Sequence, residues 1–394
     1  MRTSGVIVKL TFFMGGKLIT GRGGENVLFN LMSFKPSDIE LEIIEPDFIF
    51  GPPRLTDNEV KKLTENCKII KIKRHYYKTE KVVINLLINF FLNFFKKDYK
   101  WSQRHGFLEE IRNTDVAYLF ENGYSIFFKG MKIPVIGTSH NFDFFRGIQK
   151  KTIKNEIIRN ISLKKYYFLY FRYINGFHAF VDKKESKQLD LKYKMILPNG
   201  INVKTFYPDY NIKNKNVKFL FVGLLHPNKG LDILLPVIDR INDSRAEFHI
   251  VGVGDLEEKI KKHKSVIYHG LVDNDSLSKI YRECDVFIYP SHADTYSLVV
   301  LEALSSGLYV LTGEYLRGNF DDFEGKYLEY LPMDVESFYN RVTEIINNRK
   351  IIEHNKKFEY EYVKEHYDWR VIANKFYEFI KKFYEESQKD KKRQ

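Results

Sequence analysis

This sequence of 394 residues lacks the features of several specialised protein classes. It has 2 cysteines, Cys67 and Cys284, which are too few for a disulfide framework or a cysteine-rich zinc site and favour a reducing compartment. No apolar run reaches the ~18 residues that a membrane-spanning helix needs, and no apolar stretch near the start is followed by a small-residue cleavage site. We therefore expect a cytoplasmic protein without a secretory signal.

Acidic residues are scarce in one half of the chain only. Residues 1–200 contain 34 Lys and Arg against 20 Asp and Glu, whereas the remainder contains 29 against 31. The net charge of +12 therefore comes from the first half, and its candidate partners are nucleic acid, an anionic membrane surface and a phosphorylated substrate. We expect no nucleic-acid partner, because the positive charge is dispersed and no zinc-finger, RNA-recognition or helix-turn-helix motif is present.

The second half of the chain alternates short apolar segments with helical patterns. The apolar segments are residues 219–223, 248–254, 266–270, 285–290 and 308–313. Between them, segments such as 231–241 and 277–283 have apolar residues at helical spacing. This alternation predicts a doubly wound parallel sheet, in which ligands bind beyond the carboxyl ends of the strands.

The first half repeats the pattern less clearly. Its expected strands are residues 5–13, 115–120, 134–140 and 176–182, and its expected helices are residues 21–33 and 148–173. Residues 196–209 contain Pro, Asn and Gly and are interpreted as the passage between two domains. A chain of this length exceeds one ordinary core. We therefore predict an N-terminal domain at 1–200 and a second domain at 201–369.

The most informative motif is PSHADTYSLVVLEALSSG, residues 290–307. A strand leads into a polar loop, and a helix is expected to begin near Tyr296 with Ser297 among its candidate caps. The open N-terminus of a helix has free N–H groups and a partial positive charge, which suit a phosphate. Asp294 at its mouth and Glu302 in its second turn can hold different hydroxyls of one ligand. Spacing alone favours a simpler interpretation, a capping Asp and an exposed helical Glu.

This segment resembles the E-x7-E motif of the retaining family 4 glycosyltransferases, with Asp294 in place of the first Glu. Further segments resemble, in the right order, the family's early glycine segment, interdomain segment, donor-phosphate loop, GxG strand end and base-binding turn. They are GGENVLFNL (23–31), ILPNGINVKTFYP (196–208), FVGLLHPNKGLDILL (221–235), HIVGVGD (249–255) and VIYHGLV (266–272). The resemblance implies the α/β GT-B fold, in which two Rossmann-like doubly wound domains face a central cleft.

The resemblance also implies roles for individual residues. Lys229 would hold the donor diphosphate, Glu302 the nucleotide ribose and Asp294 the transferred sugar, with His140 near the reacting sugar. His140, Asp294 and Lys229 would be catalytic. The residues implied in donor binding are Gly23, Gly24, Gly223, Lys229, Leu271, Asp294, Tyr296, Ser297, Leu298, Val299 and Glu302. The alternatives are that Lys229 is a solvated turn residue and His140 an ordinary strand-end histidine.

The function implied is sugar transfer, with retention of anomeric configuration, from a UDP- or GDP-sugar to a hydroxyl of a lipid-linked, glycan or protein acceptor. In the mechanism usually proposed for the family, the leaving phosphate helps to deprotonate that hydroxyl. Lys229 and the helix N-terminus would stabilise the charge on the departing diphosphate. We expect no metal and no other cofactor, because the acidic DND segment at 273–275 is interpreted as helix capping.

The sequence departs from the family pattern at the site itself. Leu224 stands where the phosphate loop usually has Arg, and Arg22, Arg146 or Arg317 would have to replace the missing guanidinium. Asp294 is one methylene shorter than the usual Glu. The alternative function is therefore a catalytically impaired relative that binds sugar nucleotides or glycans.

Two basic, aromatic segments are candidates for contact with an anionic membrane, residues 82–100 and 164–173. They predict a peripheral membrane protein, and the alternative is that residues 82–95 form a buried helix with basic ends. At the C-terminus, an amphipathic pattern predicts a helix at about 370–388 that crosses back onto the N-terminal domain, followed by a solvated tail at 389–394. The oligomeric state is left open.

Overall fold

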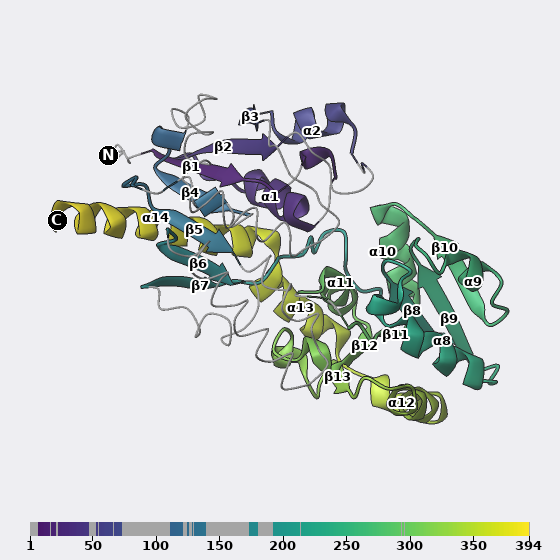
Figure 1. Ribbon diagram of the computed structural model, residues 1–394. Helices are drawn as coiled ribbons and strands as arrows, with labels where there is room; N and C mark the ends of the chain where they lie inside the picture. The colour runs from purple at the N-terminus through teal and green to yellow at the C-terminus, as the bar shows by residue number, and fades with distance from the viewer. Residues whose placement is uncertain are drawn as a thin grey trace, which may run out of the picture. The chain divides into compact units, whose positions relative to one another are not determined.

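The computed structural model describes residues 7–15, 17–20, 23–46, 53, 55–65, 67–72, 111–120, 124–125, 128, 130–138, 173–179, 192–212, 214–292, 294 and 296–393. The chain divides into two compact units, which we call the first unit (Met1–Leu197 with Ala373–Gln394) and the second unit (Pro198–Ile372) (Figure 1). The division falls within the segment of Pro, Asn and Gly in which a domain passage was predicted.

The first unit is built on seven parallel strands in the order β3-β2-β1-β4-β5-β6-β7. The strands are β1 (Val8–Phe13), β2 (Ile39–Pro46), β3 (Lys68–Ile72), β4 (Val116–Leu119), β5 (Val135–Thr138), β6 (Gly176–Ala179) and β7 (Tyr193–Ile196). In the described part of this unit, the named helical elements are η1 (Leu18–Thr20), α1 (Gly23–Ser33), α2 (Asp57–Leu63) and the C-terminal helix α14 (Trp369–Arg393), which belongs to this unit from Ala373 onward.

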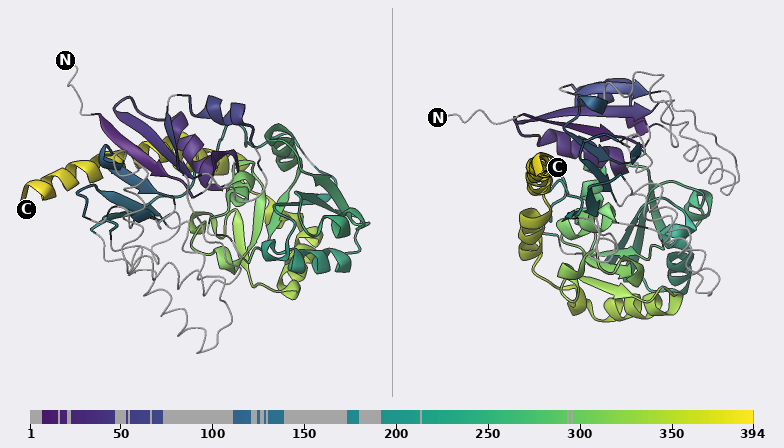
Figure 2. Two further views of the ribbon diagram at one scale, coloured as in Figure 1. Left: turned by 45° about the horizontal axis from the view of Figure 1, so that its top comes forward. Right: turned by 60° about the vertical axis from the view of Figure 1, so that its left-hand side comes forward.

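The middle of this sheet is almost completely buried. Every residue of β4 and β5 is buried, as expected for parallel strands that are covered on both faces. Phe12 of β1, Tyr118 of β4 and Phe376 of α14 pack together with ring centroids 5.3 to 6.2 Å apart. The helix from the end of the chain therefore completes the core of the first unit, along the sheet as Figure 2 shows.

Helix α14 corrects one prediction. It continues through Arg393, whereas the sequence predicted a helix to about residue 388 and a solvated tail after it. The Asp390 carboxylate accepts hydrogen bonds from Lys192 Nζ at 2.9 Å and from the Tyr193 hydroxyl at 3.1 Å, just before and at the start of β7. These tertiary contacts hold the last turns of the helix, and a polar sequence alone does not reveal them.

The second unit is built on six parallel strands in the order β10-β9-β8-β11-β12-β13. The strands are β8 (Val217–Val222), β9 (Ala246–Val251), β10 (Val266–Gly270), β11 (Val286–Tyr289), β12 (Tyr309–Gly313) and β13 (Leu328–Leu331). The helices are α8 (Leu231–Arg240), α9 (Glu257–Lys261), α10 (Asn274–Glu283), α11 (Leu298–Ser305), α12 (Val335–Asn347) and α13 (Lys356–Tyr367), with short 3-10 turns η5 (Pro227–Lys229), η6 (Glu314–Leu316), η7 (Asp321–Phe323) and η8 (Arg349–Ile352).

The sequence missed β2, β3, β7 and β13, which carry charged residues between apolar ones. Glu42 of β2 explains why such a strand is stable: its carboxylate is 1% exposed and pairs with Lys9 of β1 at 3.2 Å and Lys68 of β3 at 3.3 Å. The charge is acceptable because neighbouring strands supply its partners. These partners are distant in sequence, so a search for continuous apolar runs overlooks such a strand.

Both sheets confirm the predicted Rossmann-like, doubly wound α/β fold. In the second unit the chain goes from β8 to β9 on one side and from β11 to β12 on the other, although β8 and β11 are neighbours. Ligands of such sheets bind at the carboxyl ends of the two strands where the direction of winding changes. In this unit those ends are Val222 and Tyr289, and the loops that follow them contain most of the predicted donor site.

Candidate active site

The loop after β8 is held against the loop after β11 by glycine geometry. Gly230 has φ +89°, and a Cβ on it would lie 2.1 Å from the carbonyl oxygen of Pro290. The backbone N–H of His292 also donates to the carbonyl of Asn228 at 2.9 Å. Only glycine allows this approach, which fixes Lys229, the residue before Gly230, at the mouth of the β11 loop.

Lys229 and Asp294, the two predicted catalytic residues of this unit, form an ion pair. The other carboxylate oxygen of Asp294 accepts a hydrogen bond from the Tyr289 hydroxyl at 2.5 Å. Tyr289 is 2% exposed, and burial raises the pKa of its hydroxyl well above the usual value, so that it stays protonated and donates. Ser291 lies at 3.4 Å from the same oxygen. Both oxygens of the Asp294 carboxylate are thus held by neighbouring side chains.

Helix α11 begins at Leu298, with Ser297 at the N-cap position. The Ser297 side chain makes no capping hydrogen bond, in contrast to the capping role considered from the sequence. The first N–H groups of a helix have no partner within the helix, and those of Leu298 and Val299 lie in this turn. The turn follows the segment that holds Asp294, and it supplies the partial positive charge that suits a phosphate.

Glu302 lies in the second turn of α11 and is not an exposed helical residue. Its carboxylate accepts a hydrogen bond from the Tyr281 hydroxyl of α10 at 2.9 Å. Burial raises the pKa of Glu302 to about 7, because the hydrogen bond from Tyr281 only partly offsets the loss of water. The simpler interpretation of an exposed Glu is therefore wrong, and the carboxylate is poised to change protonation near neutral pH.

Two glycines in the loop after β9 lie close to the backbone of the loop after β8. Gly252 has φ +135°, and a Cβ on it would lie 1.8 Å from the carbonyl oxygen of Gly223. A Cβ on Gly254 would lie 2.7 Å from the carbonyl oxygen of Leu225. The predicted GxG strand end is therefore a close backbone contact, and Gly223 is part of it.

Three apolar side chains stand exposed at the carboxyl ends of β8, β9 and β10. Leu224 is 52%, Val253 36% and Leu271 76% exposed. An exposed apolar surface at this edge of the sheet has the chemistry that suits the flat, weakly polar part of a ligand such as a nucleobase.

Five of the predicted residues belong to the first half of the chain. His140, Arg22 and Arg146 lie outside the described residues. Gly23 and Gly24 begin α1 in the first unit, and a Cβ on Gly24 would make only an ordinary contact with Phe120 at 3.6 Å.

Arg317 and Tyr296 also have other partners. Arg317 pairs with Glu324 and lies over the ring of Tyr330, and no described contact joins it to Lys229. Tyr296 packs on Phe320 with ring centroids 5.0 Å apart, so its ring belongs to the core of the unit.

The acidic DND segment caps a helix, as the sequence indicated. Asp273 is the N-cap residue of α10 and accepts hydrogen bonds from the N–H and hydroxyl of Ser276 at 2.8 and 2.9 Å. In the described part of the chain, no three His, Cys, Asp or Glu residues are grouped so as to hold a metal ion. Among the same residues, no helix is long and apolar enough to cross a membrane. Residues 82–100 and 164–172 are outside the description, so the membrane interpretation stays a prediction.

Sequence reasoning missed Tyr289 and Tyr281, which hold the two carboxylates. Tyr289 lies in a fully apolar strand pattern and Tyr281 on the apolar side of a helix, so both are indistinguishable from core residues in the sequence. A buried tyrosine hydroxyl needs a hydrogen-bond partner, so a tyrosine at a predicted core position was the available sign that a polar group lies close by.

Comparisons with known proteins relate the second unit to one family. The family model described as "Glycosyl transferases group 1" matches residues 216–348, from β8 to α12. Sulfoquinovosyl transferase SQD2 of Arabidopsis thaliana is 29% identical over 195 residues, which are 45% of this chain and 37% of that protein. The chain spans less than two thirds of the length of the curated relatives it matches.

Solved structures extend the similarity of fold to both units. Sucrose-phosphate synthase from Thermosynechococcus elongatus has a TM-score of 0.69 at 15% identity, with 96% of this chain and 99% of that chain covered. HepE from Anabaena in complex with UDP-glucose has a TM-score of 0.65 at 12% identity, with 95% and 99% covered. These comparisons support a relationship to the group 1 glycosyltransferases through the second unit and a GT-B fold for the chain as a whole.

Proposed function

We propose that this chain is a glycosyltransferase that moves a sugar from a nucleotide-diphosphate sugar to a hydroxyl acceptor. One observation carries the proposal: Lys229, Asp294 and the N-terminus of α11 converge at the carboxyl ends of β8 and β11. This is the position where a doubly wound sheet binds its ligand. A cation and open helix N–H groups at that position match a diphosphate.

In this proposal the second unit stabilises the leaving group. Lys229 and the first N–H groups of α11 lie where they would meet the negative charge that grows on the departing diphosphate, which is the largest electrostatic contribution to such a reaction. Lys229 is already paired with Asp294, so these two charges offset each other. The donor diphosphate would share Lys229 with Asp294, and the transferred sugar would then lie close to that carboxylate.

Glu302 would accept hydrogen bonds from the ribose hydroxyls. Its second oxygen is not engaged by Tyr281, whose hydroxyl donates to Oε2. The exposed Leu224, Val253 and Leu271 would cover the nucleobase. A UDP-sugar is the first donor to test, because HepE, a structural neighbour, was solved with UDP-glucose.

Further properties belong to the proposal as expectations. They are retention of anomeric configuration, transfer of a hexose, a metal-independent reaction without other cofactors, and an acceptor that is held by the first unit and is lipid-linked, a glycan or a protein. Peripheral contact with an anionic membrane and a cytoplasmic location are likewise expected from the sequence alone. His140 would lie near the reacting sugar.

A second candidate function is a protein that binds the donor without using it. The observation in its favour is Leu224, which is exposed where the related enzymes have the second cation of the phosphate loop. A single Lys229 that is shared with Asp294 provides less charge for a leaving group than a pair of cations.

Donor titration calorimetry followed by turnover tests both candidates. UDP-, GDP- and ADP-glucose are titrated into the full chain and into Glu302→Ala, with the exposed Glu353→Ala as the matched control. One nucleotide class should bind the wild type and the control at least tenfold more tightly than Glu302→Ala, since two hydrogen bonds to a carboxylate are lost, at about 1.5 kcal/mol or more each. Release of free nucleotide on incubation then supports the enzyme, binding without release supports the second candidate, and no binding of any donor contradicts both.

A further inference from the structure

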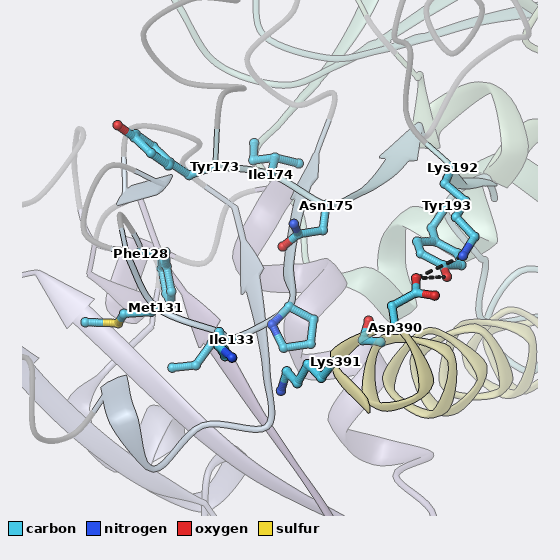
Figure 3. A pocket seen from close by; sticks show the side chains of 14 residues that line it. Phe128, Met131, Ile133, Tyr173, Ile174, Asn175, Lys192, Tyr193, Asp390 and Lys391 are labelled. Atoms are coloured by element: carbon cyan, nitrogen blue, oxygen red, sulfur yellow. Dashed lines mark hydrogen bonds and ion pairs between the residues drawn. The ribbon is translucent and has the colours of Figure 1, made fainter. Parts of the chain in front are cut away.

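A cavity of about 550 Å³ lies in the first unit, away from the carboxyl ends of its strands (Figure 3). Its walls are the residues just before β5, β6 and β7 together with the last turns of α14. The cavity is therefore at the amino ends of the strands, the opposite edge from the one where doubly wound sheets bind their substrates. Its volume lies within the range of ~300–1,000 Å³ that is typical of small-molecule sites.

The polar part of the wall is mainly cationic. Lys132, Lys192 and Lys391 come from three separate segments, and Asp390 is the one carboxylate among the described residues that line the cavity. Lys192 and Asp390 neutralise each other at 2.9 Å. Within the described part of the chain, Lys132 and Lys391 have no carboxylate at ion-pair distance. The described residues of the lining thus carry two positive charges in excess.

Lys391 is half-buried, and its surroundings penalise its charge. Burial lowers the pKa of its ammonium, the charge of Asp115 acts in the opposite direction, and the charge of Lys132 lowers the pKa further. An anion in the cavity would remove this penalty, because it would face both ammonium groups at once.

The side of the cavity that faces the Lys192–Asp390 pair has mainly apolar side chains. Figure 3 shows Phe128, Met131 and Ile133 on one side of the cavity and the Lys192–Tyr193–Asp390 cluster on the other. A bare phosphate ion would use only part of this space. Cations next to an apolar wall instead suit a phosphate that carries an organic group.

We propose that this cavity binds the phosphate group of a phosphate ester, with Lys132 and Lys391 as its cationic ligands and the apolar wall against its organic part. The phosphate comes either from a soluble ester or from a lipid headgroup, and the chemistry that recognises it is the same. The described residues that line the cavity all belong to the first unit, and none of them is a predicted donor residue, so the proposal does not depend on the function proposed above.

Calorimetry on the full chain at constant ionic strength tests this site. The probes are inorganic phosphate and glycerol 3-phosphate. The variant is Lys132→Ala/Lys391→Ala, and the matched control is Lys375→Ala/Lys382→Ala, which removes the same charge from exposed lysines of α14. We expect saturable binding of glycerol 3-phosphate, weakened by about tenfold or more in the variant and by less than about twofold in the control.

Asp390→Asn adds a test in which the expected result is tighter binding and not a loss of binding. Removal of the negative charge from the lining should tighten glycerol 3-phosphate binding by about two- to fivefold. Thermal unfolding of each variant checks that it is folded. The proposal would be overturned if Lys132→Ala/Lys391→Ala and Lys375→Ala/Lys382→Ala bound glycerol 3-phosphate with equal affinity. It would also be overturned if neither probe showed saturable binding to the wild type.

Vesicle sedimentation distinguishes the two sources of phosphate. Vesicles of phosphatidylglycerol with phosphatidylcholine are compared with phosphatidylcholine alone. A lipid source predicts binding to the anionic vesicles that is lost in Lys132→Ala/Lys391→Ala and kept in the control, and a soluble source predicts calorimetric binding with equal vesicle binding by both variants.

Discussion

The two units have sheets of one topology but place their functional groups differently. The order β3-β2-β1-β4-β5-β6 of the first unit repeats as β10-β9-β8-β11-β12-β13 in the second. In the second unit the charged groups Lys229, Asp294 and Glu302 gather at the carboxyl ends of the strands. In the described part of the first unit, the cavity with excess lysine lies at the amino ends. A shared topology therefore provides two possible edges, and the loop residues decide which edge is used.

Glycine geometry is the clearest local difference. In the second unit Gly230 and Gly252 let neighbouring loops touch at distances that no Cβ permits. Gly130 of the first unit has a similar positive φ, but a Cβ on it would meet no atom within 4 Å, so it serves a turn and not a contact. Close contacts between loops make a rigid site, and a rigid site is what electrostatic stabilisation of a leaving group requires.

The largest expected effect is the loss of turnover when Lys229 is removed. Lys229→Ala should lower donor turnover by about 10²–10³-fold, the usual result of removing one preorganised charge from a leaving group. Stability should fall by about 1–3 kcal/mol, because both side chains of the ion pair are mostly buried and the Asp294 carboxylate loses its cation. Steady-state kinetics and thermal unfolding measure both, with the exposed Lys262→Ala as control. Turnover within about threefold of the wild type would remove Lys229 from the mechanism.

The next largest effect is on stability, and it is tested by replacing one glycine in each unit with alanine. Gly230→Ala should destabilise by about 3 kcal/mol or more, since the backbone is left-handed and the methyl group meets a carbonyl oxygen at 2.1 Å. Gly130→Ala should cost only about 1 kcal/mol, the conformational part alone. Denaturant unfolding combined with hydrogen exchange assigns each loss to its unit. Equal losses in the two variants would mean that the loop contact adds nothing.

A smaller, pH-dependent effect is expected at Glu302. Its raised pKa of about 7 means that the folded chain binds a proton more tightly than the unfolded chain. This group therefore lowers stability as pH rises from about 4.5 to 7, and the loss is complete above 7. Glu302→Gln should raise stability at pH 8 by about 1–2 kcal/mol and have little effect at pH 4.

Unfolding measured at both pH values tests this, with Glu353→Gln as the control. The same substitution should weaken donor binding, because the amide is a poorer acceptor for ribose hydroxyls than a carboxylate. A gain in stability that is the same at both pH values would contradict the assignment of the pKa to Glu302.

The smallest effect on activity is expected when the Tyr289 hydroxyl, which donates a hydrogen bond to Asp294, is removed. Tyr289→Phe should lower kcat/KM by about three- to tenfold, which is less than the full value of a hydrogen bond to a charged group because Lys229 still holds the carboxylate. Its effect and that of Asp294→Asn should not add, because both act on one carboxylate. Tyr309→Phe, which removes a buried hydroxyl from Glu329, serves as the control for stability alone. Additive losses in the double variant would mean that Tyr289 acts independently of Asp294.

The sequence predicted the second unit better than the first. Its apolar runs end in glycine or proline, so β8 to β12 could be located to within about three residues at either end. The strands that were missed, such as β2 and β13, mix charged and apolar residues, and their stability depends on partners from other strands. The segment that contains His140 lies outside the described residues, and the role of this histidine stays a prediction.

The sequence by itself determined the alternation of strands and helices, the order of the motifs and the identity of the residues at the carboxyl ends of β8 and β11. These follow from local patterns of apolar residues and glycines, which are readable without any long-range contact. Only the tertiary structure decided that Tyr289 and Tyr281 hold the two carboxylates, that Glu302 is half-buried, and that Lys132 and Lys391 share one cavity. Each of these depends on which distant side chains surround a group, because burial and proximity set the energy of a charge.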